Sequence, residues 1–316
     1  MDGQELKILV TGATGFIGSH LALKLVQQGH EVYALERYVT NRFVLGEEKK
    51  LKTIFGDLRE QFTVRRIVHE IQPDAVVHLA SISAVAYSYD HPHEVMETNF
   101  IGTMNLVEAC LHELPNLKHF LFASSSETYG NGPIPKTEET PQNPNSPYAV
   151  SKLACEKYLL YMRDTYQLPI TILRNFNTYG RKDNTHFVVE RTITQMLKGG
   201  PVKLGDPTPT RDLEYVDDHV KSYLACLDNP KAKGEIINFC TGRSTSIEQL
   251  VDMISELCEY KGKIIWNTIP ARPLDIKDLV GDYSKAKRLL KWEPDFTLEK
   301  GLELTVNFWK NKLKRT

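Results

Sequence analysis

A tyrosine and a lysine stand four residues apart in the stretch SPYAVSK, as Tyr148 and Lys152. If this stretch is helical, the two side chains share one face and the lysine ammonium can stand near the phenol. A positive charge held there favours the phenolate, so we expect the pKa of Tyr148 to lie below the usual value of about 10. Such a pair could take a proton from a hydroxyl group. The alternative is an ordinary i,i+4 pair on a solvent-exposed helix.

A second polar group, SSSETYG, follows the apolar run FLFA at residues 120–123. The run fits a strand that is covered on both faces, and in an open α/β sheet ligands bind outside the carboxyl ends of such strands. Ser125 and Glu127 are therefore candidate site residues. The alternative is a serine-rich turn that exposes its side chains to water.

The stretch ILVTGATGFIGSHLALKL places Gly12, Gly15 and Gly18 after a predicted strand and at the opening of a predicted helix. Glycines allow unusual backbone dihedrals there and bring N–H groups and the helix N-terminus against a pyrophosphate. The next predicted strand ends at Glu36, whose carboxylate can accept hydrogen bonds from the adenosine ribose. Together these features predict dinucleotide binding.

The identity of the dinucleotide depends on Glu36 and its neighbour. The Glu36 carboxylate would repel a 2′-phosphate, which favours NAD as the cofactor. Arg37 could instead pair with that phosphate, so NADP stays open.

The elements that must position these residues follow from the pattern of the chain. Strand-like runs lie at residues 6–11, 31–35, 51–55, 74–80, 118–123 and 168–175, and they alternate with helical patterns that include 17–28, 97–111 and 148–166. This alternation predicts an α/β fold with a doubly wound parallel sheet. Ser146 and Pro147 predict the start of the third helix.

The alternation of strand-like and helical patterns changes after about residue 176. From there, short predicted strands surround a helical stretch, TSIEQLVDMISELCEY. We expect a Rossmann domain over residues 1–176 and a smaller α+β substrate lobe over 177–316, with an interleaved boundary. Thr245 to Glu248 fits a capping box, and the apolar stripe after it predicts core.

Composition excludes several function classes. The net charge is −1, so no overall field attracts nucleic acid or an anionic membrane. The five cysteines are widely spaced and predict neither disulfides nor a zinc site, and no metal site is expected. The start of the chain lacks signal-peptide features and no run is apolar enough to span a bilayer, so we expect a cytoplasmic protein.

The glycine spacing and the Tyr-x-x-x-Lys pair resemble the short-chain dehydrogenase/reductase superfamily. The serine-rich segment resembles its extended branch, the nucleotide-sugar epimerases and dehydratases, which includes GDP-mannose dehydratase-like and UDP-sugar epimerase-like proteins. The resemblance covers almost the whole chain. It implies bound NAD and a nucleotide-diphosphate sugar as substrate, and it implies that Ser125 completes a triad with Tyr148 and Lys152. Ser125 would bind the sugar hydroxyl, Tyr148 would remove its proton and Lys152 would grip the nicotinamide ribose.

The resemblance also implies further contacts along the chain. The cofactor contacts are expected at Gly12, Thr14, Gly15, Phe16, Ile17, Gly18, Glu36, Arg37, Asp57, Leu58, Leu79, Ala80, Ser81 and Asn99. The substrate contacts are expected at Ser83, Asn177, Arg211 and Arg272. Asn177 and the two arginines would hold the diphosphate, because the guanidinium fork matches phosphate oxygens.

Members of this branch begin by moving a hydride from hexose C4 to the nicotinamide. The resulting oxo group acidifies the C5 hydrogen, and Glu127 stands where the 4,6-dehydratases carry the base that removes it. Ser126 stands where dTDP-glucose dehydratases have an aspartic acid, so proton delivery to a C6 leaving group is left open. The alternatives are a 4-epimerase, a 5-epimerase, or chemistry on a 5,6-ene sugar.

Two further expectations concern class and assembly. A non-catalytic NAD(P)-binding regulatory protein would be expected to lose Tyr148 or Lys152, and both are present. The resemblance implies a homodimer paired through the helices at 97–111 and 148–166. The outer faces of these helices are expected to carry Met96, Leu106, Leu159 and Met162.

Overall fold

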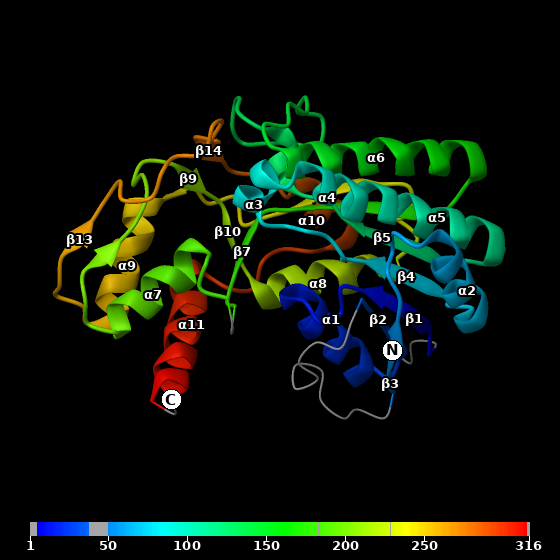
Figure 1. Cartoon of the computed structure of the whole chain (residues 1–316), viewed down its shortest axis with the longest axis horizontal. Helices are drawn as coiled ribbons and strands as arrows, with labels where there is room; N and C mark the ends of the chain where they lie inside the picture. Colours follow the sequence, from blue (N-terminus) through cyan, green and yellow to red (C-terminus); the bar gives the residue numbers. More distant parts are fainter. Residues whose placement is uncertain (1–4, 38–49, 182–183, 228, 315–316) are drawn as a thin grey trace.

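The structure, a computed structural model, describes residues 5–37, 50–181, 184–227 and 229–314. Its centre is a seven-stranded parallel sheet in the order β11-β6-β5-β4-β1-β2-β3, which confirms the predicted fold class (Figure 1). Six of its strands match the expected runs: β1 (Lys7–Thr11), β2 (Glu31–Glu36), β3 (Leu51–Phe55), β4 (Ala75–His78), β5 (His119–Ala123) and β6 (Ile170–Asn175). The seventh strand, β11 (Ile236–Phe239), was not expected and pairs with β6.

Helices cover both faces of the sheet (Figure 1). One face packs against α1 (Phe16–Gln27), α8 (Val216–Leu227) and α10 (Ser284–Leu290). The other face packs against α2 (Gln61–Ile71), α5 (Gly102–Glu113) and α6 (Pro147–Tyr166). Because helices cover both faces, the central strands are buried along almost their whole length rather than at every second residue, as expected for a parallel sheet.

The helix expected over 97–111 is divided in the structure. After α3 (Val85–Asp90) and α4 (Pro92–Met96), residues Glu97–Ile101 form a π-helical turn, η2, and α5 follows it. Helix α6 begins where the sequence predicted, because the Ser146 side chain accepts a hydrogen bond from Ala149 N and Pro147 stands in the first turn.

A second group of elements forms its own core beside the sheet. The elements after residue 176, apart from α8, α10 and β11, are β7 (Asn177–Tyr179), α7 (Val188–Leu197), β8 (Val202–Lys203), β9 (Thr210–Arg211), β10 (Leu213–Tyr215), β12 (Thr245–Ser246), α9 (Ile247–Cys258), β13 (Ile264–Ile265), β14 (Asp278–Leu279) and α11 (Leu298–Leu313). The chain returns from this group to the large sheet through α8, β11 and α10, so elements on both sides of residue 176 build the sheet.

The expected capping box of α9 is wrong by one residue. Ser246, rather than Thr245, caps the helix: its side chain accepts from Gln249 N, and the Gln249 side chain accepts from Ser246 N. Thr245 is buried in β12, where it pairs with Arg211 of β9. Thr245, which the sequence pattern assigned to the helix cap, therefore belongs to strand β12 instead.

The expected outer face of the paired helices is also wrong. Leu106, Leu159 and Met162 are 0%, 0% and 1% exposed and belong to the core between helices and sheet, while Met96 is half-buried. Leu106, Leu159 and Met162 point inward because the most apolar face of α5 and of α6 packs against the sheet. The apolar side chains that α6 and η2 leave in solvent are Ile101, Val150, Tyr161 and Tyr166.

Among the residues that the structure describes, no helix combines the length and the apolar character needed to cross a membrane.

Candidate active site

The serine-rich stretch turns inward at the carboxyl end of β5. Residues Ser126–Tyr129 form a 3-10 turn, η3, which Ser125 caps by accepting a hydrogen bond from Glu127 N at 3.2 Å. Ser125 and Glu127 are only 9% and 8% exposed, and Ser126 is buried as well. The stretch is therefore not a solvated surface turn.

A buried ion pair between Arg174 and Glu156 holds the η3 turn in place through hydrogen bonds to its flanking residues. Arg174 of β6 donates to both carboxylate oxygens of Glu156 on α6, with Nε–Oε1 at 3.0 Å and Nη2–Oε2 at 2.7 Å. Ser124 Oγ donates to the same carboxylate, and Arg174 Nη1 donates to the Tyr129 hydroxyl at 2.9 Å. Residues on both sides of Ser125 and Glu127 are thus tied to one pair of charges.

Helix α6 brings Tyr148 and Lys152 to the same place. The Ser125 side chain forms a hydrogen bond with the Tyr148 hydroxyl. Lys152 Nζ donates to the Ala123 carbonyl at 2.7 Å and lies 6.0 Å from the centre of the Tyr148 ring. The structure therefore unites the three side chains of the expected triad.

The expected fall in the pKa of Tyr148 is not found. Burial raises the pKa of Tyr148 well above its usual value, although the Ser125 hydrogen bond lowers it. Burial also lowers the pKa of Lys152 to about 8. Both side chains are almost fully removed from water, so the cost of burying a charge sets the direction of both pKa shifts.

Two arginines lie in the electrostatic reach of Glu127. Burial raises the pKa of Glu127, while the charges of Arg272 and Arg211 lower it. Asp275 Oδ1 accepts from Arg272 Nη2 at 2.6 Å and from Arg211 Nη2 at 3.3 Å, so one carboxylate bridges both guanidinium groups. The two arginines that the sequence predicted for the diphosphate therefore converge beside the candidate base.

Asp275 is a site residue that sequence reasoning missed. The available signal was an acidic residue three positions after Arg272 in the stretch ARPLDI. His78 was missed as well: its Nδ1 lies 2.7 Å from Thr11 Oγ1 and its Nε2 lies 2.9 Å from Thr103 Oγ1, behind the end of β4. Burial lowers the pKa of His78 to about 3, so the ring is neutral at physiological pH.

The glycine-rich turn forms a cradle that has no room for side chains. Gly12 has φ +71°, and a Cβ there would lie 2.8 Å from Ala80 N; a Cβ on Gly18 would lie 2.0 Å from Gly12 O. The turn between β1 and α1, which also holds Thr14 and Gly15, therefore leaves its backbone open to a close ligand, and Phe16 and Ile17 follow it as the first residues of α1. This backbone at a helix N-terminus fits a dinucleotide pyrophosphate.

The other end of the expected cofactor site lies beyond β2 and β3. Glu36 is buried at the end of β2, where it accepts from Thr53 Oγ1 at 3.5 Å. Hydrogen bonds from Arg59 hold the pKa of Asp57 below its usual value, and the charge of Arg37 also reaches this carboxylate. Glu36, Arg37 and Asp57 thus lie at the same edge of the sheet, with Leu58 next in the chain.

The remaining expected residues lie at the ends of neighbouring strands. Leu79, Ala80 and Ser81 follow β4, and Ser83 is exposed in the loop after them. Asn99 lies beneath α6: its Nδ2 donates to Ser151 Oγ at 2.9 Å and its Oδ1 accepts from Ile82 N at 2.8 Å. Asn177 begins β7.

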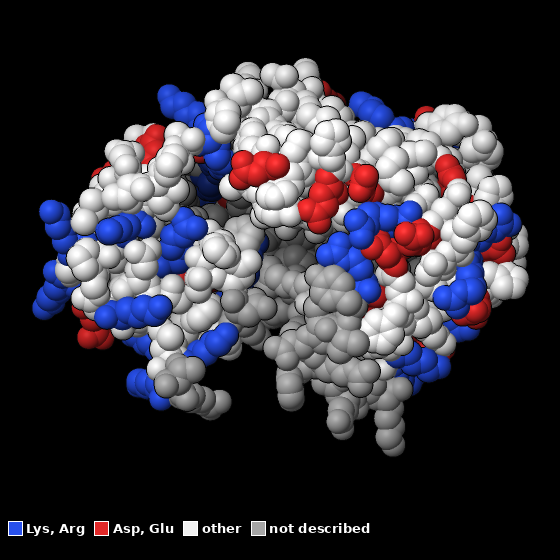
Figure 2. Space-filling model, viewed as in Figure 1, with Lys and Arg blue, Asp and Glu red and all other residues white. Residues whose placement is uncertain are grey.

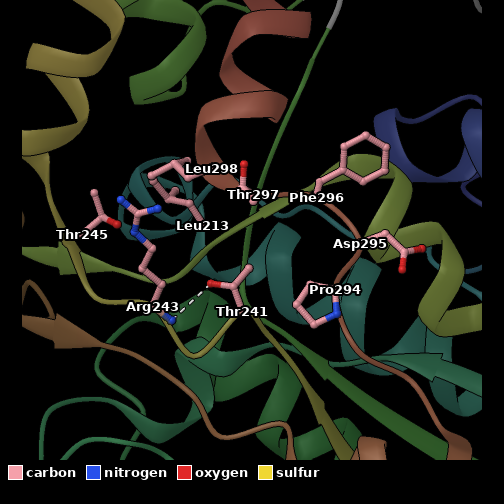
Figure 3. Close-up of a pocket in the computed structure, with 9 residues that line it drawn as sticks. All are labelled: Leu213, Thr241, Arg243, Thr245, Pro294, Asp295, Phe296, Thr297 and Leu298. Carbon is pink, nitrogen blue, oxygen red and sulfur yellow. Dashed lines mark hydrogen bonds between the residues drawn. The ribbon is translucent and has the colours of Figure 1, made fainter.

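Two hollows lie near this region. A groove of about 830 Å³ runs between α1, α8 and α11 and is bordered by Thr14, Gly15 and Phe16 of the glycine-rich turn. Figure 2 shows this face of the molecule hollowed near its centre. A smaller pocket of about 250 Å³ lies at the start of α11, where Arg243 and Thr297 line it (Figure 3). In the described parts of the chain, neither hollow is lined by the triad or by Glu127.

Comparison with known proteins places these features in a family. The sequence profile described as GDP-mannose 4,6 dehydratase matches residues 9–305. The chain is 32% identical over 307 residues to an uncharacterized UDP-glucose epimerase of Bacillus subtilis, covering 94% of this chain and 96% of that protein.

Two solved structures extend the comparison. The UDP-glucose 4-epimerase of Thermotoga maritima with UDP-glucose aligns with a TM-score of 0.90 and 32% identity, covering 97% of this chain and 99% of that one. The dTDP-glucose 4,6-dehydratase of Streptomyces venezuelae with NAD aligns with a TM-score of 0.88 and 26% identity, covering 98% of each chain.

Proposed function

The chain belongs to the GDP-mannose 4,6-dehydratase-like family of extended short-chain dehydrogenases/reductases, and from this premise we propose that it oxidises C4 of a nucleotide-diphosphate hexose with bound NAD and then carries out a 4,6-dehydration. It is an enzyme of the nucleotide-sugar epimerase and dehydratase group. The observation that supports dehydration is Glu127, a buried carboxyl two residues from Ser125 and within reach of both arginines.

Each residue of the site has a distinct task in this proposal. Ser125 and Tyr148, which share a hydrogen bond, receive the C4 hydroxyl, and Tyr148 takes its proton. Lys152 supplies a positive charge beside the phenol. When bound, NAD would supply the acceptor for the C4 hydride and would not be consumed.

Glu127 removes the C5 proton once C4 carries an oxo group, because that group acidifies the C5–H bond. The C6–O bond then breaks and a C5=C6 double bond forms. Protonated Glu127 gives its proton to the departing oxygen, which leaves as water. Glu127 then takes a proton from solvent and passes it to C5, while the hydride removed from C4 is added at C6. Ser126 is not an acid, so this double role falls on Glu127.

A 4-epimerase is the second candidate function. Ser126 provides no acid for a leaving group, and both the Bacillus subtilis relative and the Thermotoga maritima structure described above are UDP-glucose epimerases by description. A 4-epimerase would use Ser125 and Tyr148 alone and would leave C5 untouched. The 5-epimerase would require Glu127 without loss of the C6 oxygen.

Incubation of UDP-, GDP- and dTDP-hexoses with the enzyme in D₂O tests the proposal. The wild type should place deuterium at C5 of the product. Glu127→Gln should still produce reduced cofactor but lose C5 exchange by about 10²–10⁴-fold, the usual cost of a missing base. Tyr148→Phe should abolish both steps. C5 exchange at the wild-type rate in Glu127→Gln, or interconversion of C4 epimers without exchange, would reject the dehydratase and favour the epimerase.

The binding partners belong to the same proposal. The lobe built by β7–β10, α7, α9 and α11 would hold the nucleotide sugar, with Asn177, Arg211 and Arg272 on its diphosphate and Ser83 nearby.

Glu36 would favour NAD over NADP as the cofactor, and identification of the dinucleotide released on denaturation checks this. We also propose a homodimer, formed through α5 and α6, and a cytoplasmic location.

A further inference from the structure

The side chain of Arg181 reaches from the elements around β7, α7 and α11, which we call the second lobe, to the first residue of α1. Its guanidinium carbon lies 3.6 Å from the centre of the Phe187 ring and 4.6 Å from the centre of the Phe16 ring. Phe187 is the N-cap residue of α7, whereas Phe16 follows Gly15 of the glycine-rich turn and begins α1. One guanidinium thus contacts an aromatic ring on each side, and such cation–π contacts strengthen as the cation is removed from water.

Hydrogen bonds hold Arg181 within the second lobe. Glu190 of α7, which is 0% exposed, accepts from Gly180 N at 3.0 Å and from Arg181 N at 2.8 Å. Trp309 Nε1 of α11 donates to the Arg181 carbonyl at 3.1 Å. The guanidinium donates to the Thr178 carbonyl, and its Nη1 lies 4.0 Å from Glu190 Oε2. The backbone of Arg181 is therefore fixed in the second lobe, and only its side chain extends to α1.

The charge of Arg181 stands at the N-terminal end of α1. The N-terminus of a helix carries a partial positive charge, so it repels a guanidinium and attracts an anion. Helix α1, which the structure describes in full, has no acidic residue in its first turn and no side-chain cap. A dinucleotide pyrophosphate on the glycine-rich turn would bring negative charge to both the helix end and the arginine. Bound cofactor and the Arg181 contact should therefore stabilise each other.

Arg181 is also close in the chain to a proposed substrate contact. Strand β7 begins at Asn177, the residue proposed to contact the sugar diphosphate, and Arg181 follows directly after this strand and Gly180. Strand β7 is only three residues long and pairs with β10, where Leu213 stands opposite Asn177. The short segment 177–181 therefore joins the proposed diphosphate contact to the arginine that contacts Phe16.

We infer that Arg181 is a positioning residue that couples the two ligands: it holds Phe16 and the glycine-rich turn from the second lobe, so that cofactor and nucleotide sugar strengthen each other's binding. A nucleotide sugar on Asn177 fixes β7 and with it Arg181, and the held Phe16 keeps the turn in the shape that receives the pyrophosphate. Coupling between two binding sites is reciprocal, so each ligand raises the affinity of the other by the same factor. The inference rests on the proposed function for the place of Asn177.

Cofactor exchange in the holoenzyme tests the inference without turnover. Protein purified with bound NAD is mixed with an excess of radiolabelled NAD, and the exchange rate is measured with and without a saturating nucleotide. The probes are UDP, GDP and dTDP, whose binding to the holoenzyme is first measured by isothermal titration. A nucleotide that binds should slow exchange in the wild type by about fivefold, which corresponds to the typical strength of a partly buried cation–π contact.

Two variants remove the contact from opposite sides. Arg181→Met should exchange NAD about fivefold faster than the wild type and should no longer respond to the nucleotide. Phe16→Leu should give the same result, and the double variant should exchange no faster than either single variant, because both changes remove one interaction. Lys312→Met is the matched control: Lys312 Nζ lies 4.9 Å from the centre of the Trp309 ring, but both residues belong to α11. It should leave the exchange rate and the response to the nucleotide unchanged.

Three results would overturn the inference alone: a wild type that binds a nucleotide without any change in NAD exchange, an Arg181→Met protein that keeps the wild-type response, and additive effects of Arg181→Met and Phe16→Leu. If Arg181→Met does not fold, Phe16→Leu decides by itself, since it changes the other side of the same contact. A wild type that binds none of the three nucleotides would instead refute the proposed substrate class.

Discussion

Arg174 and Glu156 form a two-pronged ion pair in which the arginine side chain is 3% exposed and the glutamate side chain 0%. The pair contacts Ser124, the residue before Ser125, and Tyr129, which follows the candidate base. The position of the polar stretch is therefore set by charges that lie one layer behind it, on β6 and α6.

Removal of one partner should destabilise the whole protein. We expect Glu156→Ala to lower the free energy of unfolding by about 3–5 kcal/mol, because Arg174 would remain buried without a counter-charge. Urea denaturation measures this. The control is Glu303→Ala, which breaks the exposed pair with Lys300 and should cost less than about 1 kcal/mol. If both variants lost the same free energy of unfolding, the buried pair would stabilise the fold no more than an exposed pair does.

Arg272→Met should weaken binding of UDP or GDP by at least about tenfold, because a charge-assisted phosphate contact is worth roughly 1.5–3 kcal/mol. Arg243→Met is a closely matched control. Both arginines pair with a nearby acid, at 2.6 Å for Asp275 and 2.7 Å for Glu299, but Arg243 lines the separate pocket at the start of α11. Isothermal titration should show an effect only for Arg272, and a similar loss in both variants would refute its place in the substrate site.

Acid should destabilise the protein partly through His78. Its pKa is lowered to about 3 in the folded chain but is near 6.5 in the unfolded chain, so only the unfolded chain gains a proton between these values. The stability that the neutral ring provides is thus complete above about pH 6.5 and is lost as the pH falls towards 3, by about 1.4 kcal/mol per pH unit. Denaturation curves of the wild type and His78→Gln should converge over this range. Parallel pH profiles would mean that His78 accepts a proton in the folded state.

The exposed apolar side chains of α6 provide a test of the dimer. Tyr161 is 50% exposed, and we expect Tyr161→Glu to yield a monomer, since it would place a charge in the proposed helical interface. Phe62→Glu is the control, because Phe62 is 87% exposed on α2, outside that interface. Light scattering should give a dimer mass for the wild type and for Phe62→Glu. A monomer mass for the wild type would refute the proposed homodimer.

The sequence predicted those elements whose signals are local. Strands β1 to β6 contain short runs rich in apolar and β-branched residues, and the start of α6 is marked by Ser146 and Pro147. Strand β11 is only four residues long and obtains its place by pairing with β6, which local patterns do not reveal. In the same way, spacing placed Tyr148 near Lys152, but the sign of the pKa change depends on how completely the fold removes both from water.

Strand β11 lies about 60 residues after its partner β6 in the chain, which matters while the protein is being synthesised. During translation β6 emerges from the ribosome long before its partner, and its edge has no neighbouring strand until residues 176–235 have been added. An unpaired apolar strand edge is a template for association with other chains, so this interval is a period of exposure to aggregation and a natural point for chaperone assistance. A gene fragment that stops near residue 176 would make that temporary edge permanent, and the amino-terminal half should then be recovered as inclusion bodies unless the later strand is supplied on a second polypeptide.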